Sequence, residues 1–196
     1  IYPHADPISS QCAQHGLSHW TPLSGTGITH GAGNEYLILS GLSSSFGTAI
    51  FPSLGSEPIR VEPPADYPWD WLQRMLAIHR QARPFFRGDF HPLLEHVHSN
   101  QCWGAMQFHR ADLGAGMVAV YRRPDSPFTT TRFPLRGLAD GDCCQLQGPA
   151  SDGIDLEGNI LQVHLGTAPA ATVVFYHVNR LQADGVVRSG TSSGAP

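Results

Sequence analysis

The chain has 196 residues, of which 41% are hydrophobic and 14% are charged, and its formal net charge is −4. These values are typical of a globular protein and exclude the fibrous and disordered classes. No run approaches the roughly 18 apolar residues of a membrane-spanning helix. The 12 Lys and Arg residues stand against 16 Asp and Glu and form no basic block, so we expect neither a membrane nor a nucleic-acid partner.

The chain opens on Ile1 without an initiator Met, which predicts that it is part of a longer protein. Its N-terminal part holds three short apolar pieces, at 17–23, 36–42 and 48–54. The last of them is a continuous apolar run between two glycines, which is typical of a buried strand in an α/β layer. The long glycine-rich connections are typical of active-site loops at the strand ends of a barrel.

A helix is predicted between Asp66 and Arg83. Its apolar positions recur at spacings of four, three and four residues, at Trp71, Met75, Ile78 and Ala82. One proline suits the first turn and another ends the helix, Pro68 and Pro84. We expect the Trp71 face to pack on the strand-like pieces that precede it. Trp69, Trp71 and Trp103 are assigned to the core.

After Gly88 the apolar period becomes two, which predicts strands. The candidates are 103–109, 117–122, 128–135, 143–146, 159–165 and 171–177. Residues 110–116 read as a hairpin connection between the first two. Short strands at regular spacing predict a small antiparallel sandwich. Arg122 and Arg123 are expected at a solvated strand end, and residues 187–196 as a flexible end.

The four cysteines, Cys12, Cys102, Cys143 and Cys144, have neither CxxC spacing nor the density of a disulfide scaffold. We interpret them as mostly buried thiols, with a redox pair at the two adjacent positions as the alternative. Unpaired thiols fit a reducing compartment and predict a cytoplasmic protein.

Eleven histidines require that metal binding be considered. The tightest cluster is His91, His96 and His98. A zinc site needs further ligands and an ordered second shell, and no clear set stands nearby. We therefore predict surface histidines, no metal and no other cofactor.

A series of motifs runs in order along the chain. They are Asp6 with Pro7, Gln11, 15–22 (HGLSHWTP), 25–27, 83–90 (RPFFRGDF), Trp103, 107–110, 116–117, 121–126 and 133–138. From Asp6 to about Tyr176, their order and spacing resemble the C-terminal part of the α-galactosidase-like glycoside hydrolases of family 36 and relatives.

This resemblance implies an α+β chain that combines the C-terminal portion of a (β/α)8 (TIM) barrel with an antiparallel β-sandwich domain. Residues 1–88 would hold the last strands and last helix of the incomplete catalytic barrel. Residues 89–186 would form the C-terminal β-sandwich domain, and residues 187–196 the flexible tail. The resemblance is also compatible with an oligomer of the full-length protein.

The implied activity is hydrolysis of terminal α-linked sugars, best matched by an α-galactosidase acting with retention on an oligosaccharide or glycoside substrate. In the family, two Asp residues carry out this hydrolysis. The motif position of the acid/base falls on Asp6, and the nucleophile is expected outside this chain. The isolated fragment is therefore expected to be inactive.

The chemistry gives a physical reason for such a pair. Retention needs one carboxylate to attack the anomeric carbon and a second, about 5–5.5 Å away, to protonate the leaving oxygen. The acid needs an apolar wall or a neighbouring negative charge to raise its pKa. Asp6 before Pro7 is equally a helix N-cap, and the two roles are compatible.

Three further residues are candidates for substrate binding. Trp20 offers a flat apolar face on which a sugar ring could stack, or it is a buried barrel residue. His15 and His19 are candidates for hydrogen bonds to sugar hydroxyls, or for caps of local backbone.

Two departures from the family pattern keep other functions open. Ala5 stands where Ser is usual, and Leu39 where similar proteins tend to place Arg. A barrel-family member with lost or altered activity is one alternative. A non-catalytic carbohydrate-binding β module is another, but it would need exposed aromatics, and Phe108 and Tyr121 are expected to point inward.

Overall fold

Helices and strands are segregated along the chain. The computed structural model describes residues 6–21, 23–25, 33–45, 65–95, 97–148 and 152–179. The helices in this part are α1 (Pro7–Ser18), α2 (Glu35–Ser40), α3 (Trp69–Ala82) and the 3-10 helix η1 (Arg83–Arg87). The strands are β1 (Asp89–Pro92), β2 (Trp103–Arg110), β3 (Ala115–Arg122), β4 (Thr130–Pro134), β5 (Cys143–Leu146), β6 (Ile154–Glu157), β7 (Ile160–His164) and β8 (Ala170–Asn179).

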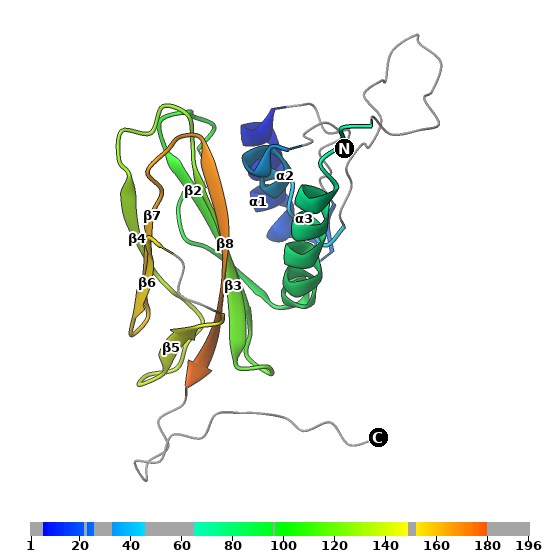
Figure 1. Ribbon diagram of the computed structural model, residues 1–196. Helices are drawn as coiled ribbons and strands as arrows, with labels where there is room; N and C mark the ends of the chain where they lie inside the picture. The colour runs from blue at the N-terminus through cyan, green and yellow to red at the C-terminus, as the bar shows by residue number, and fades with distance from the viewer. Residues whose placement is uncertain are drawn as a thin grey trace, which may run out of the picture.

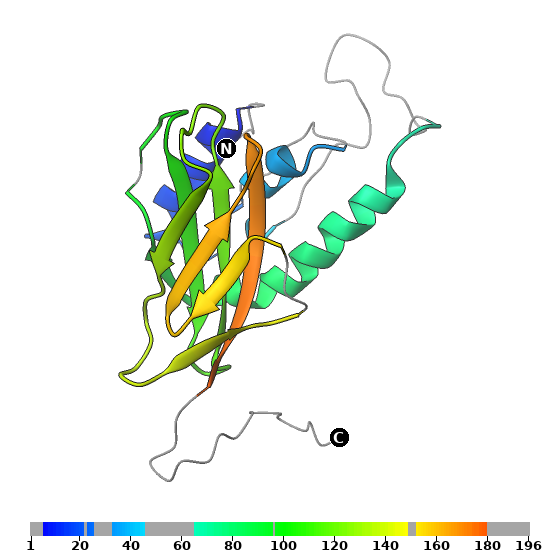
Figure 2. The same ribbon diagram turned by 60° about the vertical axis from the view of Figure 1, so that its left-hand side comes forward.

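The strands build two sheets, and the helices add a third layer. The larger sheet has the order β1-β2-β3-β8-β5 and the smaller one the order β4-β7-β6. Every strand pair in these sheets is antiparallel. The larger sheet lies in the middle, with the smaller sheet on one face and the helices on the other (Figure 1). Figure 2 shows the smaller sheet in front of the larger one. The antiparallel sandwich that the sequence predicts is therefore confirmed.

The hairpin of β2 and β3 is the centre of this arrangement. Its register runs from Trp103 opposite Arg122 to Arg110 opposite Ala115, and the turn uses Gly114 at a φ of 56°. Nearly all residues of both strands are buried. A strand covered on both faces loses the polar half of its alternation, which is why these segments are so apolar.

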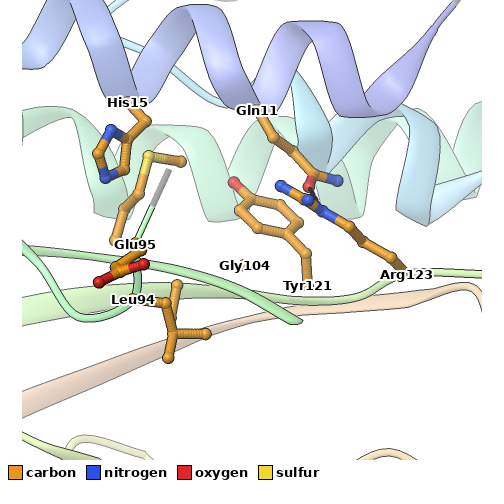
Figure 3. A pocket seen from close by; sticks show the side chains of 9 residues that line it. Gln11, His15, Leu94, Glu95, Gly104, Tyr121 and Arg123 are labelled. Carbon is orange, nitrogen blue, oxygen red and sulfur yellow. Dashed lines mark hydrogen bonds between the residues drawn. The ribbon is translucent and has the colours of Figure 1, made fainter. Parts of the chain in front are cut away.

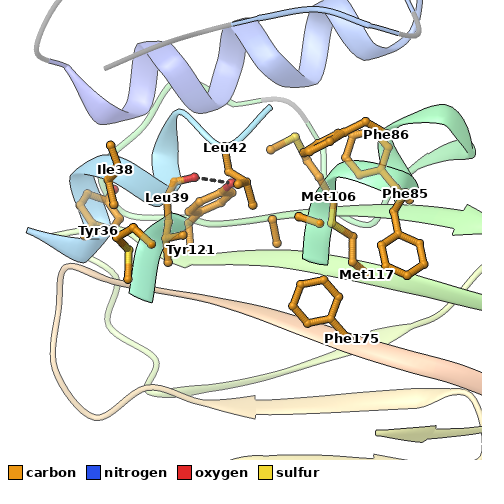
Figure 4. Close-up of a cluster of buried hydrophobic side chains, with 14 of the residues drawn as sticks. Tyr36, Ile38, Leu39, Leu42, Phe85, Phe86, Met106, Met117, Tyr121 and Phe175 are labelled. Carbon is orange, nitrogen blue, oxygen red and sulfur yellow. Dashed lines mark hydrogen bonds between the residues drawn. The ribbon is translucent and has the colours of Figure 1, made fainter. Parts of the chain in front are cut away.

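The first hydrophobic core lies between the helices and the larger sheet (Figure 4). From the helical side it receives Tyr36, Leu39, Trp71, Met75 and Phe86. The sheet contributes Met106, Phe108, Met117, Tyr121 and Phe175. The Tyr121 hydroxyl donates a hydrogen bond to the carbonyl oxygen of Leu39 at 3.1 Å. Helix α2 is thereby fixed to the middle of the sheet, and Phe108 and Tyr121 point inward as expected.

The second hydrophobic core lies between the two sheets. Val118, Val120, Val174 and Tyr176 of the larger sheet face Phe133, Leu161 and Val163 of the smaller one. In this region the Gln107 amide donates to the Tyr176 hydroxyl at 2.6 Å and to the carbonyl oxygen of Arg136 at 2.8 Å. These hydrogen bonds link the larger sheet to the segment that follows β4.

The part of the chain before Gly88 differs from the expectation of barrel strands. The apolar piece at 36–42 is mostly helical, because Asn34 accepts a hydrogen bond from the Leu37 amide and begins α2. The piece at 17–23 holds the end of α1 and the residues after it. The strand expected at 48–54 lies outside the described residues. A barrel portion is therefore not seen in the described part of the chain.

Helix α3 confirms the two prolines as boundaries, since it runs from Trp69 to Ala82 and continues only as η1. Its buried residues are Trp71, Leu72, Met75, His79 and Ala82, while Ile78 is half-buried. Helix α3 contacts α2, which holds most of the apolar piece at 36–42. The expected packing on a preceding piece is therefore confirmed there, but that piece is a helix rather than a strand. Trp71 and Trp103 are buried as predicted, but Trp69 is 45% exposed. The assignment of Trp69 to the core is wrong, because it begins the helix on the opposite side from Trp71.

Among the described residues, no helix combines the length and the apolar character needed to traverse a bilayer.

Candidate functional site

Helix α1 and the residues at its two ends carry the four residues that the sequence analysis proposes for catalysis and substrate binding. Asp6 is the N-cap, in an extended conformation at φ −93° and ψ 108°, and Pro7 follows in the first turn. The Asp6 carboxylate accepts hydrogen bonds from the backbone amides of Ile8, at 3.2 Å, and Ser9, at 3.1 Å. The N-cap reading of Asp6 is therefore confirmed.

The four predicted site residues separate into two groups. Asp6 precedes α1, whereas His19 caps its C-terminal end and Trp20 follows it. Twelve residues of helix lie between the ends, which at 1.5 Å per residue is about 18 Å. A single sugar ring therefore does not contact Asp6 and Trp20 together.

At the C-terminal end of α1, the two histidines pack against strand β1. The ring centroids of His15 and His19 lie 5.3 Å apart, and each ring meets Phe90 edge-on, at 5.6 and 5.0 Å. Trp20 is 89% exposed, so its alternative reading as a buried residue is wrong. This end of the helix presents one open indole beside an aromatic cluster.

Asp6 lies among polar groups at the other end. The Ser9 hydroxyl donates to Asp6 Oδ2 at 2.5 Å, and His98 Nε2 lies 3.3 Å from Ser9 Oγ and 3.5 Å from Asp6 Oδ2. In a Ser-His-Asp triad the two ring nitrogens of the histidine divide the contacts between Ser and Asp. Here one nitrogen faces both, so the group is not arranged as a nucleophilic relay.

The surroundings of Asp6 set its ionisation. Partial burial raises the pKa of Asp6, but the hydrogen bonds from Ser9 and Ile8 and the nearby His98 together bring it below the usual 3.8. Asp6 is thus a carboxylate near neutral pH. A general acid needs the opposite shift, and the described residues around Asp6 do not supply it. The catalytic role of Asp6 stays a prediction.

The helix cap itself has a testable pH dependence. Because the folded pKa of Asp6 lies below 3.8, the ionised cap stabilises fully above that value and loses its contribution as the pH falls through the lower folded value. Asp6→Ala is expected to lower the free energy of unfolding by about 1 kcal/mol near neutral pH. Urea unfolding at several pH values should find this difference shrinking below pH 3.8.

Asp6→Asn is the matched control for this experiment, since Asn is an equally good N-cap without a charge. Its stability should stay close to that of the unchanged protein near neutral pH. A deficit of Asp6→Ala that is constant down to the lowest pH would contradict the cap.

Behind α1 lies a small cavity at the interface of the helix with strands β2 and β3. It is lined by Gln11, His15, Leu94, Glu95, Gly104, Ala105, Met106, Tyr121 and Arg123 (Figure 3). Its volume of about 20 Å³ is room for about one water molecule and excludes a sugar. A larger and more open hollow of about 340 Å³ lies where the N-terminal end of α2 meets the start of β8. It holds none of the predicted site residues.

The structure corrects the prediction made for the two adjacent arginines at the end of β3. Arg122 and Arg123 were expected to be solvated, but both are buried, Arg123 at 4% exposure. Arg122 donates to the carbonyl oxygens of Leu165, Gly166 and Ser126. Two of these acceptors, Leu165 and Gly166, come from a loop more than forty residues away, so the local sequence gives no signal of them.

The cysteines also differ from the expectation of mostly buried thiols. Cys144 alone among the four is buried, Cys143 is exposed, and Cys12 and Cys102 are intermediate. Adjacent residues of a strand point to opposite faces, which separates the side chains of the Cys143 and Cys144 pair. Burial raises the pKa of Cys144 to about 11, so that its thiol is a poor nucleophile.

Metal binding receives no support from the described residues, which hold no cluster of three or more potential ligands. Residue 96 lies outside them, so the complete group of His91, His96 and His98 cannot be assembled there. His91 and His98 lie on β1 and on the loop after it, respectively.

Known structures share this fold. No family model matches the chain, and no curated protein is similar to it in sequence. GH36 alpha-galactosidase AgaA from Geobacillus stearothermophilus is similar with a TM-score of 0.64 and 16% identity. A substituted form of AgaA in complex with raffinose gives a TM-score of 0.62 at 16% identity. The galactosidase domain of the alpha-galactosidase-sucrose kinase AgaSK gives 0.64 at 14%.

Each of these similarities covers 89% of this chain but 25% of the solved chain. The chain thus spans about a quarter of the length of the structures it matches. At this identity the likeness shows the fold alone: an antiparallel β-rich fold with a few helices, as found in part of the GH36 α-galactosidases. The resemblance in the sequence motifs is confirmed at that level.

Proposed function

We propose that this chain is part of a retaining glycoside hydrolase that cleaves terminal α-linked sugars, with α-galactosides as the preferred class. The observation that carries the proposal is the fold likeness to GH36 α-galactosidases over 89% of the chain. The ordered motifs from Asp6 to 133–138 support it independently. In this proposal residues 1–88 belong to the end of a catalytic barrel, 89–186 to a C-terminal sandwich domain and 187–196 to a tail.

Asp6 is the proposed acid/base, and its place at the start of α1 is compatible with that role. In a retaining enzyme a second carboxylate stands about 5–5.5 Å away. We propose that this nucleophile comes from outside the chain. A neighbouring negative charge would raise the pKa of Asp6 and oppose the hydrogen bonds of Ser9 and Ile8 that now lower it. The acid would thus gain its proton only in the assembled site.

The distance from Asp6 limits the roles that we propose for Trp20, His15 and His19. At 1.5 Å per residue, the helix rises about 14 Å from Asp6 to His15 and about 20 Å to His19. These residues would therefore contact a remote unit of an oligosaccharide rather than the sugar whose bond breaks. The open face of Trp20, 89% exposed, suits stacking on such a unit.

The experiment that tests the proposal uses the full-length protein with an aryl α-galactoside. We expect hydrolysis with an α-configured first product, detected by proton NMR before mutarotation. The 196-residue chain alone should be inactive, because half of the carboxylate pair is missing and loss of a nucleophile removes most of the rate. Robust turnover by the isolated chain, or a β-configured first product, would overturn the proposal.

The alternatives are weaker. A non-catalytic carbohydrate-binding module needs a row of exposed aromatic side chains, and in the described part after Gly88 the one strongly exposed large aromatic is Phe128, 70% accessible. The other alternative, a family member with altered activity, is based on Ala5 and Leu39, which depart from the family pattern. Leu39 is buried in the first core, so it supplies no polar group to a site. The cytoplasmic location stays a prediction, as does an oligomer.

A further inference from the structure

Arg123 connects two segments that are distant in sequence. Its guanidinium group is buried just beyond the end of β3. Nε donates to Gln11 Oε1 of α1 at 3.0 Å. Nη1 donates to the carbonyl oxygen of Val97 and, at 2.9 Å, to that of Ser99. One side chain therefore holds both the first half of α1 and the loop that follows β1.

The acceptor on α1 is itself fixed in one orientation. Gln11 Nε2 donates to the Ser40 hydroxyl at 2.9 Å and to the Tyr36 hydroxyl at 3.1 Å. With its nitrogen engaged by α2, the amide can only turn its oxygen toward Arg123. Figure 3 shows Gln11 pointing from α1 toward Arg123, next to Tyr121. The position of α1 along the sheet is thus set by a chain of buried hydrogen bonds.

The loop held by Arg123 carries a neighbour of Asp6. His98 lies between Val97 and Ser99, whose carbonyl oxygens both accept from Arg123. From there His98 Nε2 reaches to 3.5 Å from Asp6 Oδ2 and 3.3 Å from Ser9 Oγ. Arg123 therefore fixes the helix that Asp6 begins and the loop that faces Asp6.

We propose that Arg123 is a positioning residue for Asp6, holding α1 and the 97–99 loop in the register that places His98 against the carboxylate. The consequence for catalysis rests on the proposed function. Lys cannot replace Arg here, because an ammonium group is a single point, whereas the planar guanidinium donates in fixed directions to three oxygens at once. Arg122, the adjacent buried arginine, binds other loops and is the matched control.

The first test is structural and needs no activity. Hydrogen exchange measured by mass spectrometry on the full-length protein compares Arg123→Lys with Arg122→Lys. In Arg123→Lys, exchange should accelerate roughly tenfold or more, as expected when a hydrogen bond to a charged group is lost, in peptides covering 8–12 and 97–100. In Arg122→Lys the acceleration should fall on 126–128 and 163–167. Equal acceleration of all four segments in both variants would overturn the proposal.

The second test separates positioning from mere stability. Arg123→Lys should lower kcat for α-galactosides with poor leaving groups more than for those with activated aryl groups, because only the former require the acid. Arg122→Lys should lower both equally or not at all. Equal losses in Arg123→Lys, with the exchange result intact, would restrict Arg123 to a structural role and overturn its catalytic consequence.

Two further variants keep the result interpretable. If Arg123→Lys does not fold, Gln11→Met frees α1 from Arg123 while the loop contacts remain, and it should reproduce the exchange change over 8–12 and the leaving-group dependence. If Asp6→Asn itself has no leaving-group dependence, the proposed role of Asp6 fails. The exchange experiment still decides whether Arg123 holds the two segments.

Discussion

In the full-length protein, Asp6→Asn is expected to lower the hydrolysis of α-galactosides with poor leaving groups by about 100- to 10,000-fold, the usual contribution of general acid catalysis. Activated aryl α-galactosides should lose much less in the first step, because their leaving groups depart without a proton. Steady-state kinetics on a series of leaving groups of different pKa measures the difference. Azide should partly restore turnover of the activated substrates, since this anion attacks the glycosyl-enzyme without a general base.

The helix cap provides the control for this result. In the structure the Ile8 and Ser9 amides donate to different oxygens of Asp6. Asn at residue 6 keeps one acceptor oxygen for the N-cap, so α1 should remain formed. Asp6→Ala, which also removes the cap, should add a loss of stability to the same leaving-group dependence. If both substrate classes lose activity equally and azide has no effect, Asp6 is a structural cap and the acid lies elsewhere.

Phe133→Ala is expected to lower the free energy of unfolding by about 3–5 kcal/mol, as truncation of a buried Phe usually does. Phe133 is 0% exposed in the core between the two sheets, and the smaller sheet has few other large side chains with which to fill the gap. Chemical denaturation of both proteins under the same conditions measures the difference.

The chain offers a matched control five positions earlier. Phe128 is 70% exposed, so Phe128→Ala removes the same atoms from solvent-exposed surroundings and should change the stability by less than about 0.5 kcal/mol. Similar losses in the two variants would contradict the arrangement of the smaller sheet.

The sequence predicts the strands that turn residues delimit clearly. Cys143–Leu146 is found with its predicted bounds, between turns at Gly141 and Gly148, which adopt positive φ. Helix α3 is likewise delimited by two prolines. The sequence analysis misses β1 and β6, each of four residues and each at the edge of its sheet. A small edge strand of this kind is defined by its partner rather than by its own residues.

The spatial arrangement of the candidate site could be predicted less well from the sequence than the strands. Asp6, His15, His19 and Trp20 are close in sequence, but a continuous helix places them at two separate ends. The buried state of Arg123 depends on acceptors at Gln11, Val97 and Ser99. Gln11 is more than a hundred residues away from Arg123 in the sequence, and no local sequence pattern predicts such a contact.

Strand β3 alternates between the two cores. Met117, Ala119 and Tyr121 face the helices, whereas Val118 and Val120 face the smaller sheet. One inserted or deleted residue would exchange these sets and bring the wrong shapes to both cores at once. Across related genes, changes of length should therefore accumulate in the turn at 111–114 and be absent from β3. The strand would evolve by substitution alone, which makes it a dependable anchor for aligning distant sequences.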